Sequence, residues 1–294
     1  MIPPLLKKTA FACAVIYLGS LPASFVVGGF LFSRPLREPF QTQDLVDAMR
    51  PEWDRNFFAL MKEVEIELRP RVRLRGTMLG AGSHATVVIL HGGGRNRVDG
   101  LEAAYRLWDS GYDVLLLDRA AHGRSDGDTR PLFGGEAAEL KLVVDALIQQ
   151  AWGGTSKIGI LGIGDAATSA LVAAAYDPRI DAVCAENPAL EATDFVLRSY
   201  ASWAPLPSFL LMPHTVLAVA GMKTAVDVEA SEFDASEALA MLSAPALILA
   251  VGADAGANAR SVYDRLKFGL GALEEGPDRD SVYSEMCRFF DRQL

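Results

Sequence analysis

Short apolar runs, rich in Val, Ile and Leu, recur along the chain from about residue 70 onward, and segments with helical periodicity separate them. An uninterrupted apolar run is typical of a strand buried on both faces, as strands are in a parallel sheet covered by helices. The pattern therefore predicts an α/β fold with a doubly wound, mostly parallel sheet. The predicted strands are Val72–Leu79, Ala85–Leu90, Asp113–Asp118, Lys157–Leu161, Ile180–Ala185 and Ala246–Val251.

Helices are expected between these strands, at Gly100–Ser110, Glu136–Gln150 and Ala166–Tyr176. The alternation stops between Asn187 and Ser243, a stretch rich in aromatic, Leu and Pro residues. Because this stretch is too long for a simple crossover, we expect a helical cap insertion at about 187–243, over one edge of the sheet.

The region before the first predicted strand divides in two. Residues 1–37 form an apolar segment with its flanks, and residues 38–70 form a polar connector with a helix near Glu52–Lys62. The predicted organisation is therefore an N-terminal anchor, this connector, and one domain over residues 71–294.

Thr9–Phe32 is nearly free of charge and mostly apolar. As a helix its 24 residues would extend about 36 Å, enough to cross a bilayer core of about 30 Å. A secretory signal peptide is the alternative, but cleavage after Ala23 would leave Leu21 where a small residue is needed. The apolar run also continues past that site, so an uncleaved transmembrane helix is favoured.

Basic residues flank the apolar segment on both sides, with Lys7 and Lys8 before it and Arg34 and Arg37 after it. The positive-inside rule gives a slight preference for a cytoplasmic N-terminus. We therefore expect a single-pass protein of the cell membrane whose globular domain lies outside the cytoplasm.

Composition excludes several classes of function. The net charge is −9, which disfavours nucleic-acid binding through phosphate contacts. Cys13, Cys184 and Cys287 are too far apart in sequence for a zinc-binding motif, so neither a metal nor a cofactor is expected.

Four motifs stand at the ends of the predicted strands. His91-Gly92-Gly93-Gly94 follows the strand at 85–90, and Asp118–Gly127 (DRAAHGRSDG) follows the next one. Gly159–Ala167 has the form strand, turn, helix, and Ala244–Leu249 (APALIL) includes the start of the strand at 246–251. In these motifs and their order, the chain resembles the α/β-hydrolase superfamily, in particular its membrane-anchored, capped branch of peptidase-like and lysophospholipase-like proteins.

The resemblance implies a nucleophilic Ser at the centre of G-x-S-x-G, a His that takes its proton, and an acid that orients the His. Here the central residue of the turn is Gly164, which has no side chain. The catalytic His would lie after the last strand, but the chain has no His beyond His214. Only the acid has a counterpart, at Asp254.

These departures predict a catalytically inactive member of the fold, a pseudoenzyme. It would bind an apolar ligand or a protein partner at a cleft formed by Gly164, the cap insertion and the oxyanion-type loop His91, Gly92, Gly93 and Gly94. In the alternative, an active ester or peptide hydrolase, relocated residues such as Asp165 and Asp254 would do the chemistry. Asp165 is also suited to stabilising the helix that follows it.

A third hypothesis comes from the same turn. Gly162–Ala167 fits G-x-G-x-x-A, and Glu186 follows the next predicted strand, which is the form of a dinucleotide-binding motif. This hypothesis explains none of the other three motifs.

Overall fold

The computed structural model describes residues 4–34, 37–70, 72–150, 156–203, 206–226, 234–252, 255–267 and 269–294. The chain divides into two compact units. The smaller contains Met1–Arg34 and Ala192–Glu229, and the larger contains Pro35–Glu191 and Ala230–Leu294.

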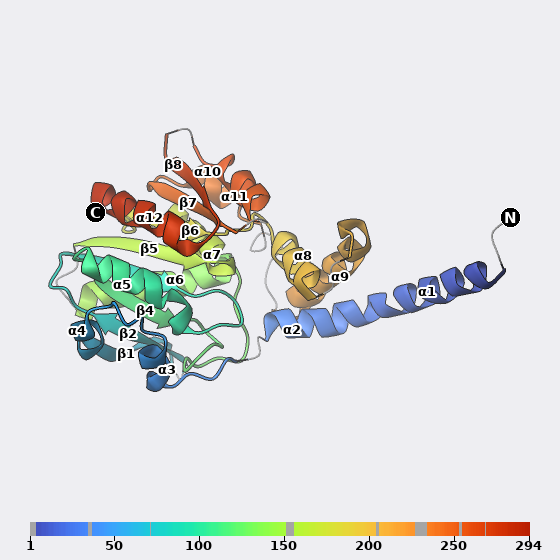
Figure 1. The fold of residues 1–294 in the computed structure, drawn as a ribbon, viewed down its shortest axis with the longest axis horizontal. Coiled ribbons are helices and arrows are strands. Elements are labelled where there is room, and N and C mark those ends of the chain that lie inside the picture. Colours follow the sequence, from blue (N-terminus) through green and yellow to red (C-terminus); the bar gives the residue numbers. More distant parts are fainter. Residues whose placement is uncertain are drawn as a thin grey trace. The chain divides into compact units, whose positions relative to one another are not determined.

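Within the described residues, the larger unit is built on an eight-stranded sheet of order β1-β2-β4-β3-β5-β6-β7-β8 (Figure 1). The pairs β1–β2 and β2–β4 are antiparallel and the remaining pairs are parallel. The prediction of a mostly parallel α/β sheet is therefore confirmed. The strands are β1 (Met61–Arg69), β2 (Val72–Leu79), β3 (Ala85–Leu90), β4 (Asp113–Asp118), β5 (Lys157–Ile163), β6 (Ala182–Glu186), β7 (Ala246–Val251) and β8 (Gly271–Gly276).

Helices flank this sheet, and the central strands are buried along their whole length, as their apolar composition predicts. Side chains of α5 and α12 share one apolar core with β3, β4 and β5, while α7 contacts β5 and β6 and packs beside α6. The helices of this unit are α3 (Thr42–Asp47), α4 (Arg55–Ala59), α5 (Leu101–Asp109), α6 (Gly134–Gln150), α7 (Asp165–Tyr176), α10 (Ser236–Met241), α11 (Gly256–Tyr263) and α12 (Arg279–Gln293), with a 3-10 turn, η2, at Arg97–Gly100.

The helix expected near Glu52–Lys62 is wrong in its extent. The structure has a single turn of helix, α4, at Arg55–Ala59, and β1 begins at Met61. In β1, Val64 and Ile66 alternate with charged residues, which is the two-residue period of a strand with one buried face.

The smaller unit is helical. A continuous helix runs through α1 (Pro4–Ala23), a π-helical segment η1 (Ser24–Gly28) and α2 (Gly29–Ser33), and we call it the N-terminal helix. The described part of the cap insertion in this unit forms α8 (Ala192–Trp203) and α9 (Ser208–Val226). Within the described residues, one helix is long and apolar enough to cross a bilayer, at Ala12–Ser33.

Candidate functional site

The turn between β5 and α7 has the geometry of a nucleophile elbow. Gly164 occupies it with φ 64° and ψ −122°, and its N–H donates to the Glu186 carbonyl at 2.8 Å. A Cβ at Gly164 would meet only the Cα of Gly92, at 3.6 Å, so the backbone conformation and not space restricts this position. The elbow keeps the turn on which α/β hydrolases carry their nucleophile, but it presents no side chain.

Asp165, the next residue, is buried and surrounded by donors. One carboxylate oxygen accepts from Arg119 Nη2 at 2.9 Å and Arg130 Nη1 at 3.2 Å, and the other accepts from the Gly93 N–H at 2.6 Å. Burial opposes ionisation, but the two guanidinium charges outweigh it and hold the pKa of Asp165 well below its usual range. Asp165 is therefore ionised at neutral pH, and both of its oxygens have partners.

One further charge, on Glu136, completes a buried cluster. Arg119 also pairs with the buried carboxylate of Glu136. Burial lowers the pKa of Arg119, but Asp165 and Glu136 outweigh this and raise it. Two cations and two anions balance in a space closed to water, and we call Arg119, Arg130, Glu136 and Asp165 the elbow ion cluster.

All three glycine amides of the loop after β3 donate to side chains of the protein itself. Gly92 N–H donates to Asp99 Oδ2 at 3.2 Å, Gly93 N–H to Asp165, and Gly94 N–H to His122 Nε2 at 3.2 Å. An oxyanion hole requires N–H groups aimed at a substrate atom. In this loop each such group already has an internal acceptor.

The two histidines beside the loop are locked in the neutral form. His91 Nε2 accepts from the Arg119 N–H at 3.1 Å, and its Nδ1 donates to the Gly92 carbonyl at 2.8 Å. His122 Nε2 accepts from Gly94, so its Nδ1 donates to the Ala120 carbonyl at 2.9 Å. Burial, together with Arg119, lowers the pKa of His91 and brings that of His122 to about 2. Neither histidine has a nitrogen left to take a proton.

An arginine begins the last helix, close to where the resemblance requires the catalytic histidine. Arg279, the first residue of α12, donates through Nε to Glu186 Oε1 at 2.9 Å and through Nη1 to Asp99 Oδ1 at 3.0 Å. Burial lowers its pKa, but Glu186 and other acidic neighbours outweigh this and raise it, so Arg279 cannot act as a general base. Because Asp99 holds the Gly92 amide and the Glu186 carbonyl holds the Gly164 amide, Arg279 braces both sides of the elbow.

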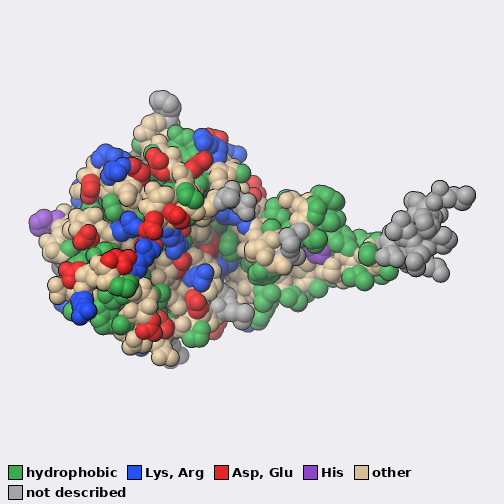
Figure 2. Space-filling view, in the orientation of Figure 1, with side chains coloured by type: hydrophobic (Ala, Val, Ile, Leu, Met, Phe, Trp, Pro, Cys, Tyr) green, Lys and Arg blue, Asp and Glu red, His purple; other side chains and the backbone are tan. Residues whose placement is uncertain are grey.

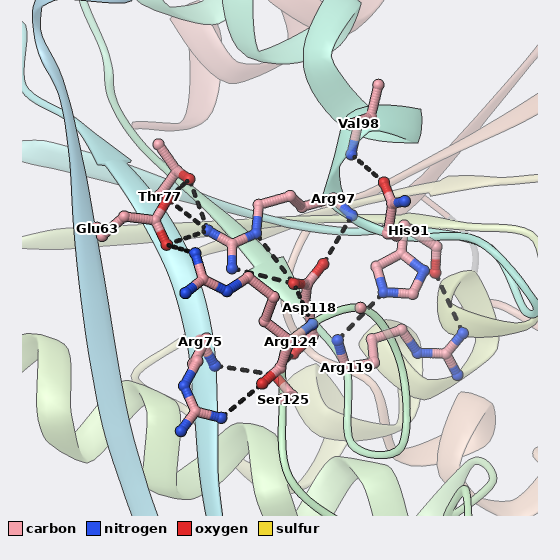
Figure 3. Close-up of polar contacts among 12 residues, drawn as sticks. Glu63, Arg75, Thr77, His91, Arg97, Val98, Asp118, Arg119, Arg124 and Ser125 are labelled. Carbon is pink, nitrogen blue, oxygen red and sulfur yellow. Dashed lines mark hydrogen bonds and ion pairs between the residues drawn. The ribbon is translucent and has the colours of Figure 1, made fainter. Parts of the chain in front are cut away.

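The motif after β4 has a structural role (Figure 3). Asp118 accepts from the backbone N–H of Arg97 at 2.8 Å, from its Nε at 3.1 Å and from the Arg124 N–H at 3.0 Å. Ser125 Oγ donates to the Asp118 carbonyl and accepts from the Arg75 N–H at 2.8 Å. Gly123, at φ 46°, is needed here because a Cβ would lie 2.3 Å from the Asp118 carboxylate. The turn thus fixes Arg119, which follows Asp118, in the elbow ion cluster.

The structure brings the predicted site residues His91, Gly92, Gly93, Gly164 and Asp165 together, whereas Asp254 lies outside the described residues. Glu186, of the dinucleotide hypothesis, is buried and accepts from Tyr283 as well as Arg279. In the described part of the chain, no group of three or more His, Cys, Asp and Glu is placed to hold a metal ion.

The arginines of the site were missed by sequence reasoning. Arg119 and Arg130 lie 46 and 35 positions before Asp165, and Arg279 lies 93 positions after Glu186. No local period connects such residues. The one available signal was Asp165 itself, because a carboxylate buried beside the elbow needs a cationic or donor partner.

Comparison with known proteins agrees with this architecture. Residues 33–212 match the model of the X-Pro dipeptidyl-peptidase (S15) family. A search of curated protein sequences finds no match. Among solved structures, the chain is similar to an esterase of Pyrococcus furiosus (TM-score 0.70, 21% identity, 90% of this chain and 98% of the esterase). It is also similar to a dienelactone hydrolase of Anabaena variabilis (TM-score 0.57, 19% identity, 80% and 99%). At these identities the solved structures show a shared α/β-hydrolase fold alone.

Proposed function

The chain belongs to the X-Pro dipeptidyl-peptidase (S15) family, and we propose that it is a membrane-anchored member that binds an apolar ligand or partner without hydrolysing it. The observation that carries the proposal is an elbow without a nucleophile, beside a loop whose amides already have acceptors. Gly164 offers no nucleophile, and the amides of Gly92, Gly93 and Gly94 donate to the protein's own side chains.

Each step of acyl transfer lacks its group at this elbow. A nucleophile needs a hydroxyl, thiol or carboxylate free to attack, but both oxygens of Asp165 are engaged. A general base needs a group that can take a proton near neutral pH. The pKa of Arg279 is raised, so it stays charged, and the pKa of His122 is lowered to about 2, so it stays neutral and does not take a proton. The elbow ion cluster instead provides a rigid scaffold for binding.

Membrane anchoring is supported by the N-terminal helix, whose Ala12–Ser33 segment is apolar and largely exposed. Exposed apolar side chains are costly in water unless a partner or a lipid phase covers them. We infer that this segment is an uncleaved anchor and that the larger unit lies outside the cytoplasm.

The test is turnover by the full chain in detergent or vesicles, with a short-chain ester, a long-chain ester and an X-Pro amide. We expect no turnover above the uncatalysed rate. Turnover that is lost in Asp165→Asn, in a preparation that circular dichroism shows to be folded, would refute the proposal in favour of a relocated nucleophile. Turnover that survives in that variant would place a catalytic site elsewhere in the chain, Asp254 included.

A further inference from the structure

The smaller unit packs α9 against the C-terminal half of the N-terminal helix, and the two run in the same direction. Tyr17 donates to the Leu210 carbonyl at 2.9 Å, and Ser24 Oγ lies 2.6 Å from His214 Nδ1. Farther along, η1 and α2 contact α9 closely. The residue numbers of contacting positions therefore increase together along both helices, which is a parallel arrangement.

Glycines allow the two backbones to touch. A Cβ at Gly29 would lie 2.5 Å from the Gly221 carbonyl carbon, and a Cβ at Gly221 would lie 2.0 Å from the Phe25 oxygen. Gly28 is as tightly placed, since a Cβ there would lie 2.7 Å from the Ala218 side chain. Close approach of helices through small residues is characteristic of packing within membranes.

The depth of this contact follows from helix geometry. The candidate span Ala12–Ser33 has 22 residues, or about 33 Å of helix, close to the thickness of a bilayer core. Contacts with α9 begin at Tyr17 and are concentrated in η1 and α2, which form the C-terminal half of that span. If Ala12–Ser33 crosses the bilayer, the helix packed against this half lies at the same depth.

The surface of α9 is suited to that environment. Its exposed apolar side chains include Phe209 (74% exposed), Met212 and Val216 (52%). The one charged residue of α9, Lys223, is partly buried and lies in its last turn, near the end of the helix. The visible face of the smaller unit is correspondingly rich in hydrophobic side chains (Figure 2). The N-terminal helix is similar, with Ile16 at 73% exposed. A cap helix that faced water would have a polar outer surface.

Polar side chains in the contact zone bond within the unit. Ser20 donates to the Tyr17 carbonyl at 2.7 Å, Thr215 to the Leu211 carbonyl at 3.0 Å, and Ser24 and His214 bond each other. In hydrocarbon, every polar group must be satisfied in this way because water is absent.

We propose that α9 lies in the bilayer hydrocarbon beside the N-terminal helix, with phospholipid acyl chains covering its exposed apolar face. The membrane domain is then formed by two segments nearly two hundred residues apart in sequence. The unit also has a groove whose apolar walls suit an acyl chain. It is lined by Phe25, Val26, Phe30, Gly221 and Ala225, and Arg34 also lines it. This inference rests on the membrane anchoring in the proposed function.

The experiment uses the full chain in phosphatidylcholine vesicles, with Cys13 and Cys287 replaced by Ser and Cys184 left in the core. An environment-sensitive fluorophore is attached to one new cysteine at a time: Phe209→Cys and Val216→Cys as tests, Ile16→Cys as the lipid reference, and Asp264→Cys as the aqueous reference. Quenching by aqueous iodide is compared with quenching by nitroxide-labelled lipid.

We expect labels at Phe209 and Val216 to behave like the label at Ile16, with iodide quenching several-fold weaker than at Asp264 and efficient quenching by lipid nitroxide. Iodide quenching like that at Asp264 would overturn the inference, as would protection from both quenchers, which indicates a protein contact such as a second copy. If the label at Ile16 is itself aqueous, the anchoring in the proposed function fails. If only the α9 labels are aqueous, the anchoring stands and this inference fails.

Discussion

Replacing Asp165 with Asn should strongly destabilise the larger unit. The side chain is 1% exposed and accepts charge-assisted bonds from Arg119 and Arg130, each worth about 1.5–3 kcal/mol. With the carboxylate removed, two buried guanidinium groups would share only Glu136. Breaking a buried ion pair from one side costs about 3–5 kcal/mol, and we expect a loss in that range at pH 7.

The matched control is Glu275→Gln, which removes the exposed Glu275–Arg260 pair. We expect it to cost less than about 1 kcal/mol because solvent screens such pairs. The assay is urea unfolding of the full chain in detergent, followed by tryptophan fluorescence. Because the pKa of Asp165 is depressed in the folded state, its stabilising effect is present above the unfolded pKa of about 3.8 and is lost only as the pH falls towards the folded value. The reasoning is refuted if Asp165→Asn is no more destabilising than Glu275→Gln.

Three other changes test separate parts of the structure. Gly164→Ser should cost about 1–3 kcal/mol in unfolding free energy, from the positive φ, and should create no esterase activity, which a chromogenic ester assay checks. Burial raises the pKa of Glu139 to about 7, so stability from this group is full below pH 4.5 and lost as the pH rises through 7. Glu139→Gln should therefore increase the free energy of unfolding at pH 8, by at most about 3 kcal/mol, and change it little at pH 4.5. The melting temperature at the two pH values checks this. Gly221→Ala should loosen the contact with the N-terminal helix and lower the yield of a disulfide engineered between positions 24 and 214, whereas Gly19→Ala, with nothing within 4 Å of the added Cβ, should not.

The sheet of the larger unit could be predicted because its information is local. The runs at 85–90 and 113–118 match β3 and β4 because a strand buried on both faces must be apolar throughout. The edge strands escaped prediction for the converse reason. β8 reads GALEEG and is largely exposed, so burial imposes no pattern on it.

The candidate site could be predicted only as a set of positions. Gly164 and the loop Gly92–Gly94 follow from motifs tied to strand ends, which meet at one edge of a parallel sheet. The partners of Asp165 could not be predicted, because Arg119 and Arg130 reach it from separate loops. The sequence places a carboxylate, Asp165, next to an elbow without a nucleophilic side chain, and only the three-dimensional contacts show that it accepts from the Gly93 amide.

The most direct test of the central claim is the intact mass and peptide map of the full chain after prolonged incubation with a fluorophosphonate and, separately, with an activated acyl ester. An elbow with no nucleophile at Gly164 and with internally bound amides at Gly92–Gly94 predicts that peptide mapping finds no adduct within residues 91–94 or 162–169 in either reaction, whatever acylation occurs at surface lysines. A stoichiometric adduct mapped to residues 91–94 or 162–169 would contradict the account, because it would require an activated nucleophile at this elbow.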